Sequence, residues 1–302
     1  MRRDAVGREQ IHEEAYRGLN VVMENERGER ERLAMLQRAA QAELALGQTI
    51  QESLVPASIE REDLSVALRH IPCDNLGGDY LQAFLPHPDL LYLCVGDVSG
   101  HGVAAALVVS RLHALVQSMF LEDIRPGPFL EALNQATLGL SQQTSFFMTF
   151  AVLRIDLSAR RIEYATAGHP AQYLLRSGRD VEELSTPNSA LGLQGIVRTP
   201  EQSVGSTTYA PGDSLLLFTD GVFEARAPGT PQSWGEENLL SGFLRHGRRA
   251  PGDVVAAILS EAKDFRGVPD FDDDVSLLVA RLGVPRPSVN ETSEPLAMTG
   301  DR

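Results

Sequence analysis

The chain has 302 residues, of which 43% are hydrophobic, and this is enough for one large domain with an appendage or for two small domains. Its 41 acidic residues outnumber the 27 basic ones, and the net charge of −14 argues against nucleic acid or an anionic membrane as the main partner. The two cysteines exclude a disulfide framework, and neither a signal peptide nor a run of about 18 apolar residues is evident, so we expect a cytoplasmic protein without a membrane span.

Residues 1–54 contain no proline and are rich in Glu, Arg, Ala and Leu, which favours a helix. In the second half, apolar residues from Leu33 to Leu54 recur at spacings of three and four and form one narrow stripe. The polar run ENERGERER (24–32) carries Gly28 and predicts a break. The stripe must be covered by something, and two alternatives are open: the helix docks on its own domain, or it forms a dimeric coiled coil. Pro56 then ends the helix.

The remainder reads as strands with a few long helices, separated by turn signals such as HPD, TPN and APGD. This pattern indicates an α+β layered domain with largely antiparallel sheets. The polar, proline-containing end of the chain, residues 283–302, is expected to be a disordered tail. Strands are predicted at 64–70, 90–97, 147–156, 161–167, 171–176, 214–220 and 275–282, and helices at 103–120, 127–142 and 251–264.

Acidic residues stand at the ends of several predicted strands. Asp79 follows two glycines in LGGDY, Asp97 ends YLCVGD, Asp220 ends SLLLFTD, and the run 272–274 precedes VSLLVAR. A single Asp-Gly after a strand is usually only a turn. An unpaired charge at the edge of a buried strand is costly, however, so four such carboxylates make most sense if they converge on cations. Oxygen ligands without a histidine-rich cluster point to Mg²⁺ or Mn²⁺.

Eight short motifs follow one another from about residue 45 to 282, and any one of them alone is weak. In order they resemble the PPM-type, metal-dependent serine/threonine phosphatases, in the bacterial SpoIIE/RsbU-like branch. This resemblance implies an αββα sandwich of two mostly antiparallel sheets flanked by helices over residues 55–282, with 1–54 as a helical linker or coiled-coil segment. The motifs are LGQTIQESLVP, LGGDY, GDVSGHGVAAAL, FFMTFAVLRID, ATAGHPAQYLL, LGL, APGDSLLLFTDGVFEAR and FDDDVSLLVAR.

The resemblance also implies a site with two ions, Mn²⁺ or Mg²⁺, that activate water for attack on phosphorus, so no protein nucleophile is needed. Asp97 would bridge the ions, and Asp97 and Asp220 would act in catalysis through the activated water. For His101 a general-acid role competes with a local hydrogen bond at the helix start, and we prefer the local bond; His169 is expected to be structural. The implied ligands are Asp79, Asp97, the backbone carbonyl of Val98, Asp220 and Asp273, and the implied supporting residues are Asp274, Gly100, His101 and Gly102.

In this branch the usual substrates are small phosphoserine or phosphothreonine proteins of the STAS type, in partner-switching control of sigma factors and stress responses. The helical segment is expected to bind an activator or to mediate self-association, and through helix 103–120 to influence the metal site. A cysteine phosphatase is excluded because the position six residues after each cysteine holds Asp79 or Gly100 instead of arginine. A diguanylate cyclase is excluded because Tyr80 and Leu81 follow GGD. The alternative that stays open is a catalytically weak module that binds a phosphoprotein without turnover.

Overall fold

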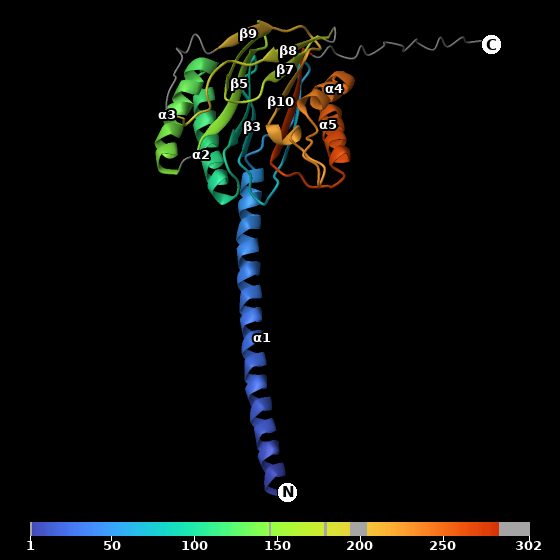
Figure 1. Cartoon of the computed structure of the whole chain (residues 1–302). Helices are drawn as coiled ribbons and strands as arrows, with labels where there is room; N and C mark the ends of the chain where they lie inside the picture. Colours follow the sequence, from blue (N-terminus) through green and yellow to red (C-terminus); the bar gives the residue numbers. More distant parts are fainter. Residues whose placement is uncertain (1, 145, 178–179, 194–203, 284–302) are drawn as a thin grey trace, which may run out of the picture. The chain divides into compact units, whose positions relative to one another are not determined.

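The computed structural model describes residues 2–144, 146–177, 180–193 and 204–283, and the chain forms two compact units, Met1–Ile50 and Gln51–Arg302 (Figure 1). The first unit is a single helix, and the second contains both sheets and the other helices. The expected disordered tail lies outside the described residues, apart from Gly283.

Helix α1 spans Arg2–Glu52 and ends two residues inside the second unit. The predicted break at Gly28 is wrong, because the helix is continuous there. A glycine in a helix interior costs about 1 kcal/mol, but good helix formers surround this one, and Arg27 pairs with Glu31 one turn later at 3.0 Å. The apolar stripe is exposed on the helix, for example at Leu33 and Leu36.

The second unit is built on two antiparallel sheets, which we term sheet A and sheet B (Figure 1). Sheet A has the strand order β1 (Ile59–Glu60), β2 (Leu64–Ile71), β11 (Val275–Leu282), β10 (Ser214–Phe218), β7 (Gln172–Leu175) and β8 (Val181–Leu184). Sheet B has the order β3 (Asp79–His87), β4 (Leu90–Val98), β5 (Met148–Asp156), β6 (Arg161–Ala167) and β9 (Gly205–Thr208).

Three apolar clusters hold this unit together as four layers. The first cluster lies between the sheets and includes Leu64 and Leu68 from sheet A and Leu91 and Leu93 from sheet B. A second cluster packs α2 (Val103–Phe120) and α3 (Pro126–Thr144) on sheet B. A third packs α4 (Glu236–His246) and α5 (Pro251–Arg266) on sheet A. The predicted αββα sandwich is therefore confirmed (Figure 1).

Each strand and helix predicted within residues 55–282 is present, with ends that differ by no more than two residues. The structure adds elements that were not predicted, chiefly β3 and α4. Helix α2 is the one helix in the described ranges that is long and apolar enough to cross a bilayer, with a mean hydropathy of 1.5 over 18 residues. This is weak evidence for a span, because its inward side chains, including Val109 and Val116, belong to the cluster on sheet B.

Candidate metal centre

Two carboxylates meet at one edge of sheet B because β3 begins where β4 ends. Asp79 is the first residue of β3, Asp97 is the last but one of β4, and the two are direct partners in the antiparallel register. Side chains of directly opposite residues share a face of the sheet, with Cβ atoms about 4.5–5.5 Å apart. The structure thus brings these two predicted residues side by side.

Sheet A supplies a second pair at the junction of β10 and β11, which are antiparallel neighbours. Asp220 opens the short 3-10 helix η2 (Asp220–Val222) after β10, and Asp273 stands two residues before β11. The two segments approach closely at Gly221, where a Cβ would lie 2.0 Å from the carbonyl oxygen of Asp274. A glycine is therefore required at that position.

The four carboxylates interact electrostatically across the two sheets. Burial, followed by the charges of Asp220 and Asp273, raises the pKa of Asp97 to about 7. Burial, followed by the charge of Asp97, raises the pKa of Asp79 well above its usual value. The pKa values of Asp220 and Asp273 are also raised, first by burial. Each carboxylate is therefore costly to ionise in this protein alone.

A hard divalent cation fits this donor set. The charges that act most strongly on these four pKa values are those of other acidic residues, and the basic neighbour named among them is His101, on Asp273. Carboxylate oxygens at this density are the ligands that Mg²⁺ and Mn²⁺ prefer. Val98, whose carbonyl was predicted as a ligand, lies beside them: its N–H donates to the carbonyl of Gly78 at 3.1 Å.

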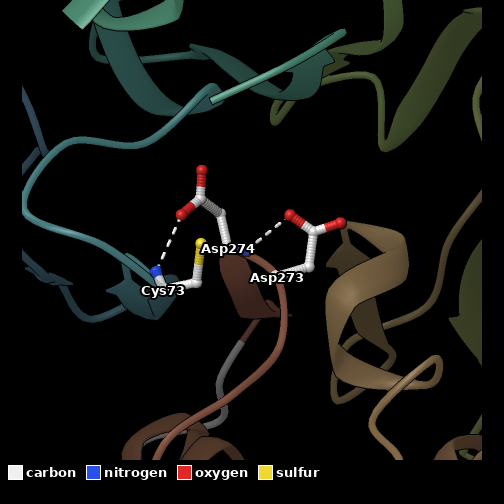
Figure 2. Close-up of side chains that lie close together, drawn as sticks. All are labelled: Cys73, Asp273 and Asp274. Carbon is white, nitrogen blue, oxygen red and sulfur yellow. Dashed lines mark hydrogen bonds between the residues drawn. The ribbon is translucent and has the colours of Figure 1, made fainter. Parts of the chain in front are cut away.

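The three consecutive aspartates make three different contacts. Asp272 pairs with Arg266 of α5. Asp273 Oδ1 accepts the N–H of Asp274 at 2.8 Å, and its Oδ2 takes no part in this bond (Figure 2). The carboxylate of Asp274 is buried and accepts the N–H groups of Cys73 at 2.8 Å and Gly78 at 2.6 Å, so it fastens the loop that leads into Asp79.

Cys73 is the member of this region that sequence reasoning did not place there. Its Sγ lies within 4.8 Å of ligand atoms of Asp273 and Asp274, the tightest such trio among the residues the structure describes (Figure 2). Burial, with Asp274 next, raises the pKa of Cys73 to about 12, so the thiol is protonated at neutral pH. Asp79, Asp97 and Asp220 do not form such a trio in the part of the chain that the structure describes.

The glycines and histidine after Asp97 form the turn into α2. Gly100 and Gly102 have φ of 92° and 80°, in the left-handed region that favours glycine. His101 is exposed, and its Nδ1 lies 3.7 Å from Asp74, in the loop before Asp79. The contact that the structure gives for His101 is this one with Asp74, and the local hydrogen bond at the helix start stays a prediction.

Several hydrogen-bonding residues around the carboxylates were missed by sequence reasoning. Thr219 Oγ1 donates to Asp79 Oδ2 at 2.8 Å, and the side chain of Ser276 also hydrogen-bonds Asp79. Gln51 pairs with the backbone of Gly77, donating to its carbonyl at 2.7 Å and accepting its N–H at 3.0 Å. The only signal in the sequence was a hydroxyl residue one or two positions from an aspartate, in FTD and DDVS.

His169 links the two sheets behind the centre, in line with the structural role expected for it. It is buried, its Nε2 lies 3.0 Å from the carbonyl oxygen of Phe218, and its Nδ1 lies 2.7 Å from Thr149 Oγ1. Thr149 is the partner of Asp97 in the register of β4 and β5. The histidine therefore ties the strand beside Asp97 to the end of the strand before Asp220.

Comparison with known proteins agrees with this geometry. A family model described as Stage II sporulation protein E (SpoIIE) matches residues 87–283. The phosphoserine phosphatase RsbU of Bacillus subtilis (strain 168) is 25% identical over 262 residues, which cover 85% of this chain and 75% of RsbU. The resemblance found in the motifs is thereby confirmed.

Solved structures support the same fold. The SiaA-PP2C domain of Pseudomonas aeruginosa has a TM-score of 0.71 at 22% identity, covering 82% of this chain and 98% of that chain. The RsbU and RsbW domains of Rv1364c from Mycobacterium tuberculosis give 0.62 at 26% identity, covering 77% and 64%. The catalytic domain of the phosphatase PstP, solved with two manganese ions, gives 0.51 at 18% identity, covering 73% and 99%.

Proposed function

Because the chain belongs to the SpoIIE family of PPM-type serine/threonine protein phosphatases, we propose that it hydrolyses phosphoserine or phosphothreonine on a regulatory protein with the help of two divalent metal ions. The observation that carries this proposal is the meeting of four strand-end carboxylates with raised pKa values, whose strongest charged neighbours are other acidic residues. A cluster of this kind that bound no ion would only destabilise the folded protein.

The ions would be Mn²⁺ or Mg²⁺, held by Asp79, Asp97, Asp220, Asp273 and the carbonyl oxygen of Val98. When bound, such ions activate water and offset charge on the phosphoryl oxygens. The residues around the site position these ligands. Thr219 and Ser276 orient Asp79, Asp274 holds the loop before it, and the antiparallel register sets Asp97 beside it.

Water is the nucleophile that the surroundings favour. Burial raises the pKa of Cys73 to about 12 and that of the fully buried Cys94 well above its usual value. Neither thiol therefore offers a thiolate at neutral pH. The side chains of the centre would hold the ions, the ions would bind the phosphoryl group of a phosphorylated residue, and the attack is left to water.

We further propose a small phosphoprotein of the STAS type as substrate, in partner-switching signalling in the cytoplasm. Two findings support this choice: RsbU is a phosphoserine phosphatase, and a solved relative contains an RsbU domain and an RsbW domain in one protein. The exposed apolar stripe of α1 supports self-association or binding of an activator there. If residues 1–45 can be deleted without changing the oligomeric state in solution or the affinity for Mn²⁺, this role of α1 is wrong.

The test is phosphatase activity of the purified chain on p-nitrophenyl phosphate and on a phosphoserine STAS protein, with Mn²⁺ or with EDTA. We expect activity that needs Mn²⁺ and that Asp97→Ala abolishes. Asp156→Ala is the matched control, because Asp156 also ends a strand but accepts the local N–H of Ala159, at 2.7 Å. Absence of both activity and Mn²⁺ binding would reject the proposal in favour of a binding module without turnover.

A further inference from the structure

His70 stands at the outer end of a chain of hydrogen bonds that reaches Asp79. Its Nδ1 lies 3.0 Å from Ser276 Oγ, and the side chain of Ser276 hydrogen-bonds Asp79. A second hydroxyl completes the arrangement, since Thr219 Oγ1 donates to Asp79 Oδ2 at 2.8 Å and accepts the N–H of Ser276 at 2.9 Å. Two hydroxyl groups thus converge on the buried Asp79 carboxyl group, and each has a nitrogen partner behind it.

The number of protons fixes the direction of these bonds. An ionised carboxylate only accepts, so the single hydroxyl hydrogen of Ser276 must point to Asp79 when Asp79 is ionised. The Ser276 oxygen then accepts from His70, which requires the proton of the ring to be on Nδ1. Burial lowers the pKa of His70, although Asp274 and Glu52 act to raise it, so the ring is neutral at pH 7 and has one N–H to place.

We propose that His70 is a positioning residue for the metal centre: its Nδ1–H turns the Ser276 hydroxyl toward Asp79 and so orients that carboxylate as a metal ligand. This inference rests on the proposed function, because it needs a metal at Asp79. Hydrogen-bond partners behind metal ligands typically change metal affinity about 10–100-fold when they are removed.

The surroundings of His70 decide which substitutions can test this. The ring lines an open groove of about 310 Å³, with Glu52, Pro56 and Arg69, and also a small cavity of about 10 Å³ that touches Asp79. A truncation to alanine would join the groove to the cavity and admit water behind Asp79. The replacement must therefore keep the volume of the ring and change only its donor.

The experiment measures Mn²⁺ binding to the full chain by calorimetry, with thermal unfolding in EDTA as the check on folding. His70→Leu keeps the bulk and removes the donor, and we expect it to raise the Kd for Mn²⁺ about tenfold or more. His70→Asn places an amide N–H close to the position of Nδ1, and we expect it to bind Mn²⁺ within about threefold of the wild type. His246→Leu is the control, because His246 pairs with Glu261 in the α4–α5 layer, and its Kd should not change.

Four results would overturn the inference. A folded His70→Leu protein with wild-type affinity would show that the donor does nothing at Asp79. Equal losses in His70→Leu and His70→Asn would assign the effect to packing. If His70→Leu does not fold, it is replaced by His70→Gln, whose amide lies beyond the position of Nδ1. Equal Mn²⁺ affinity of the Gln and Asn variants would then contradict the inference. A wild-type chain that binds no Mn²⁺ would overturn the proposed function and this inference together. If the wild type binds Mn²⁺ and Asp97→Asn does not, the proposed site stands, and the His70 variants then test this inference alone.

Discussion

Asp273 and Asp274 are neighbours in the chain with the same side chain, yet their surroundings give them different tasks. Asp274 is buried and accepts two backbone N–H groups from the loop before β3. Asp273 is reached by solvent, and its carboxylate accepts the N–H of Asp274 (Figure 2). The first is suited to holding the loop, and the second is suited to holding an ion.

Two conservative substitutions should separate these tasks. Asp273→Asn should lower Mn²⁺-dependent activity about 100-fold or more, since a charged ligand is lost, and leave the thermal stability in EDTA unchanged or higher, since repulsion is relieved. Asp274→Asn should lower the free energy of unfolding by about 1.5–3 kcal/mol, because the bonds it accepts are charge-assisted. Urea unfolding in EDTA and a p-nitrophenyl phosphate assay measure the two effects.

The opposite pattern would exchange the roles of the two residues. If Asp274→Asn abolished Mn²⁺ binding with no loss of stability while Asp273→Asn destabilised the fold, the ligand would be Asp274. Asp272→Asn serves as the third comparison, because Asp272 pairs with Arg266 at the end of α5, and its loss should leave Mn²⁺ binding intact.

At the scale of elements, the sequence was most informative where apolar residues follow one another in a strand or recur on one face of a helix. Strand β4 and helix α2 were predicted almost to the residue for this reason. Strand β3 was missed because the polar residues Asp79 and Gln82 interrupt its apolar residues directly after two glycines, although its first five residues are all buried. Helix α4 was missed because it is short and contains Gly242.

The carboxylates of the site could be found from the sequence, but their geometry could not. Their position at strand ends was visible in the chain, and it implied a common edge. The pairing of Asp79 with Asp97 depends on the register of β3 and β4. No residue near either aspartate indicates that register in the sequence. The contacts of Ser276 with Asp79 and of Gln51 with Gly77 depend on tertiary packing between distant parts of the chain, so only the structure supplies them.

The last turn of α1 and the loop before β3 form one hydrogen-bonded element through Gln51. Its amide satisfies both backbone groups of Gly77, and a Cβ on Gly77 would lie 2.5 Å from the Asp274 carboxylate. Gln51→Leu leaves a buried N–H and a buried carbonyl without their partner, at a cost of about 1–3 kcal/mol each. We therefore expect lower stability and weaker Mn²⁺ binding together.

Calorimetric titration with Mn²⁺ and thermal unfolding test this link between Gln51 and the site. Thr49→Ala is the neighbouring control, because the Thr49 hydroxyl makes a local bond to the carbonyl of Ala45, at 3.0 Å. Lower stability with unchanged Mn²⁺ affinity in Gln51→Leu would mean that the loop keeps its position at Asp79 without this pair.

For the whole molecule, the acidic centre makes stability depend on both pH and metal. The folded pKa of Asp97, about 7, lies above its usual value of 3.8, so its stabilising contribution is present at low pH and lost as the pH rises through about 7. Burial lowers the pKa of His169 to about 4, from 6.5, so its contribution is complete above pH 6.5 and lost only as the pH falls toward 4. Burial also lowers the pKa of His70 and of His113, so these histidines, together with His169, favour the folded state as the pH rises past 6.5 and oppose the effect of the carboxylates.

We therefore expect the titration of Asp97 to remove about 1 kcal/mol of stability from the metal-free protein, measured against Asp97→Asn, as the pH rises from about 6.5 to 8, which corresponds to about 2–4 °C in Tm. Mn²⁺ should remove this loss, and its stabilising effect should grow with pH because the ion competes with protons for the same oxygens. Thermal unfolding in EDTA and in excess Mn²⁺ across this range measures both slopes. Asp97→Asn should flatten the slope in EDTA, whereas an equal slope in the variant would mean that titration of Asp97 is not its source.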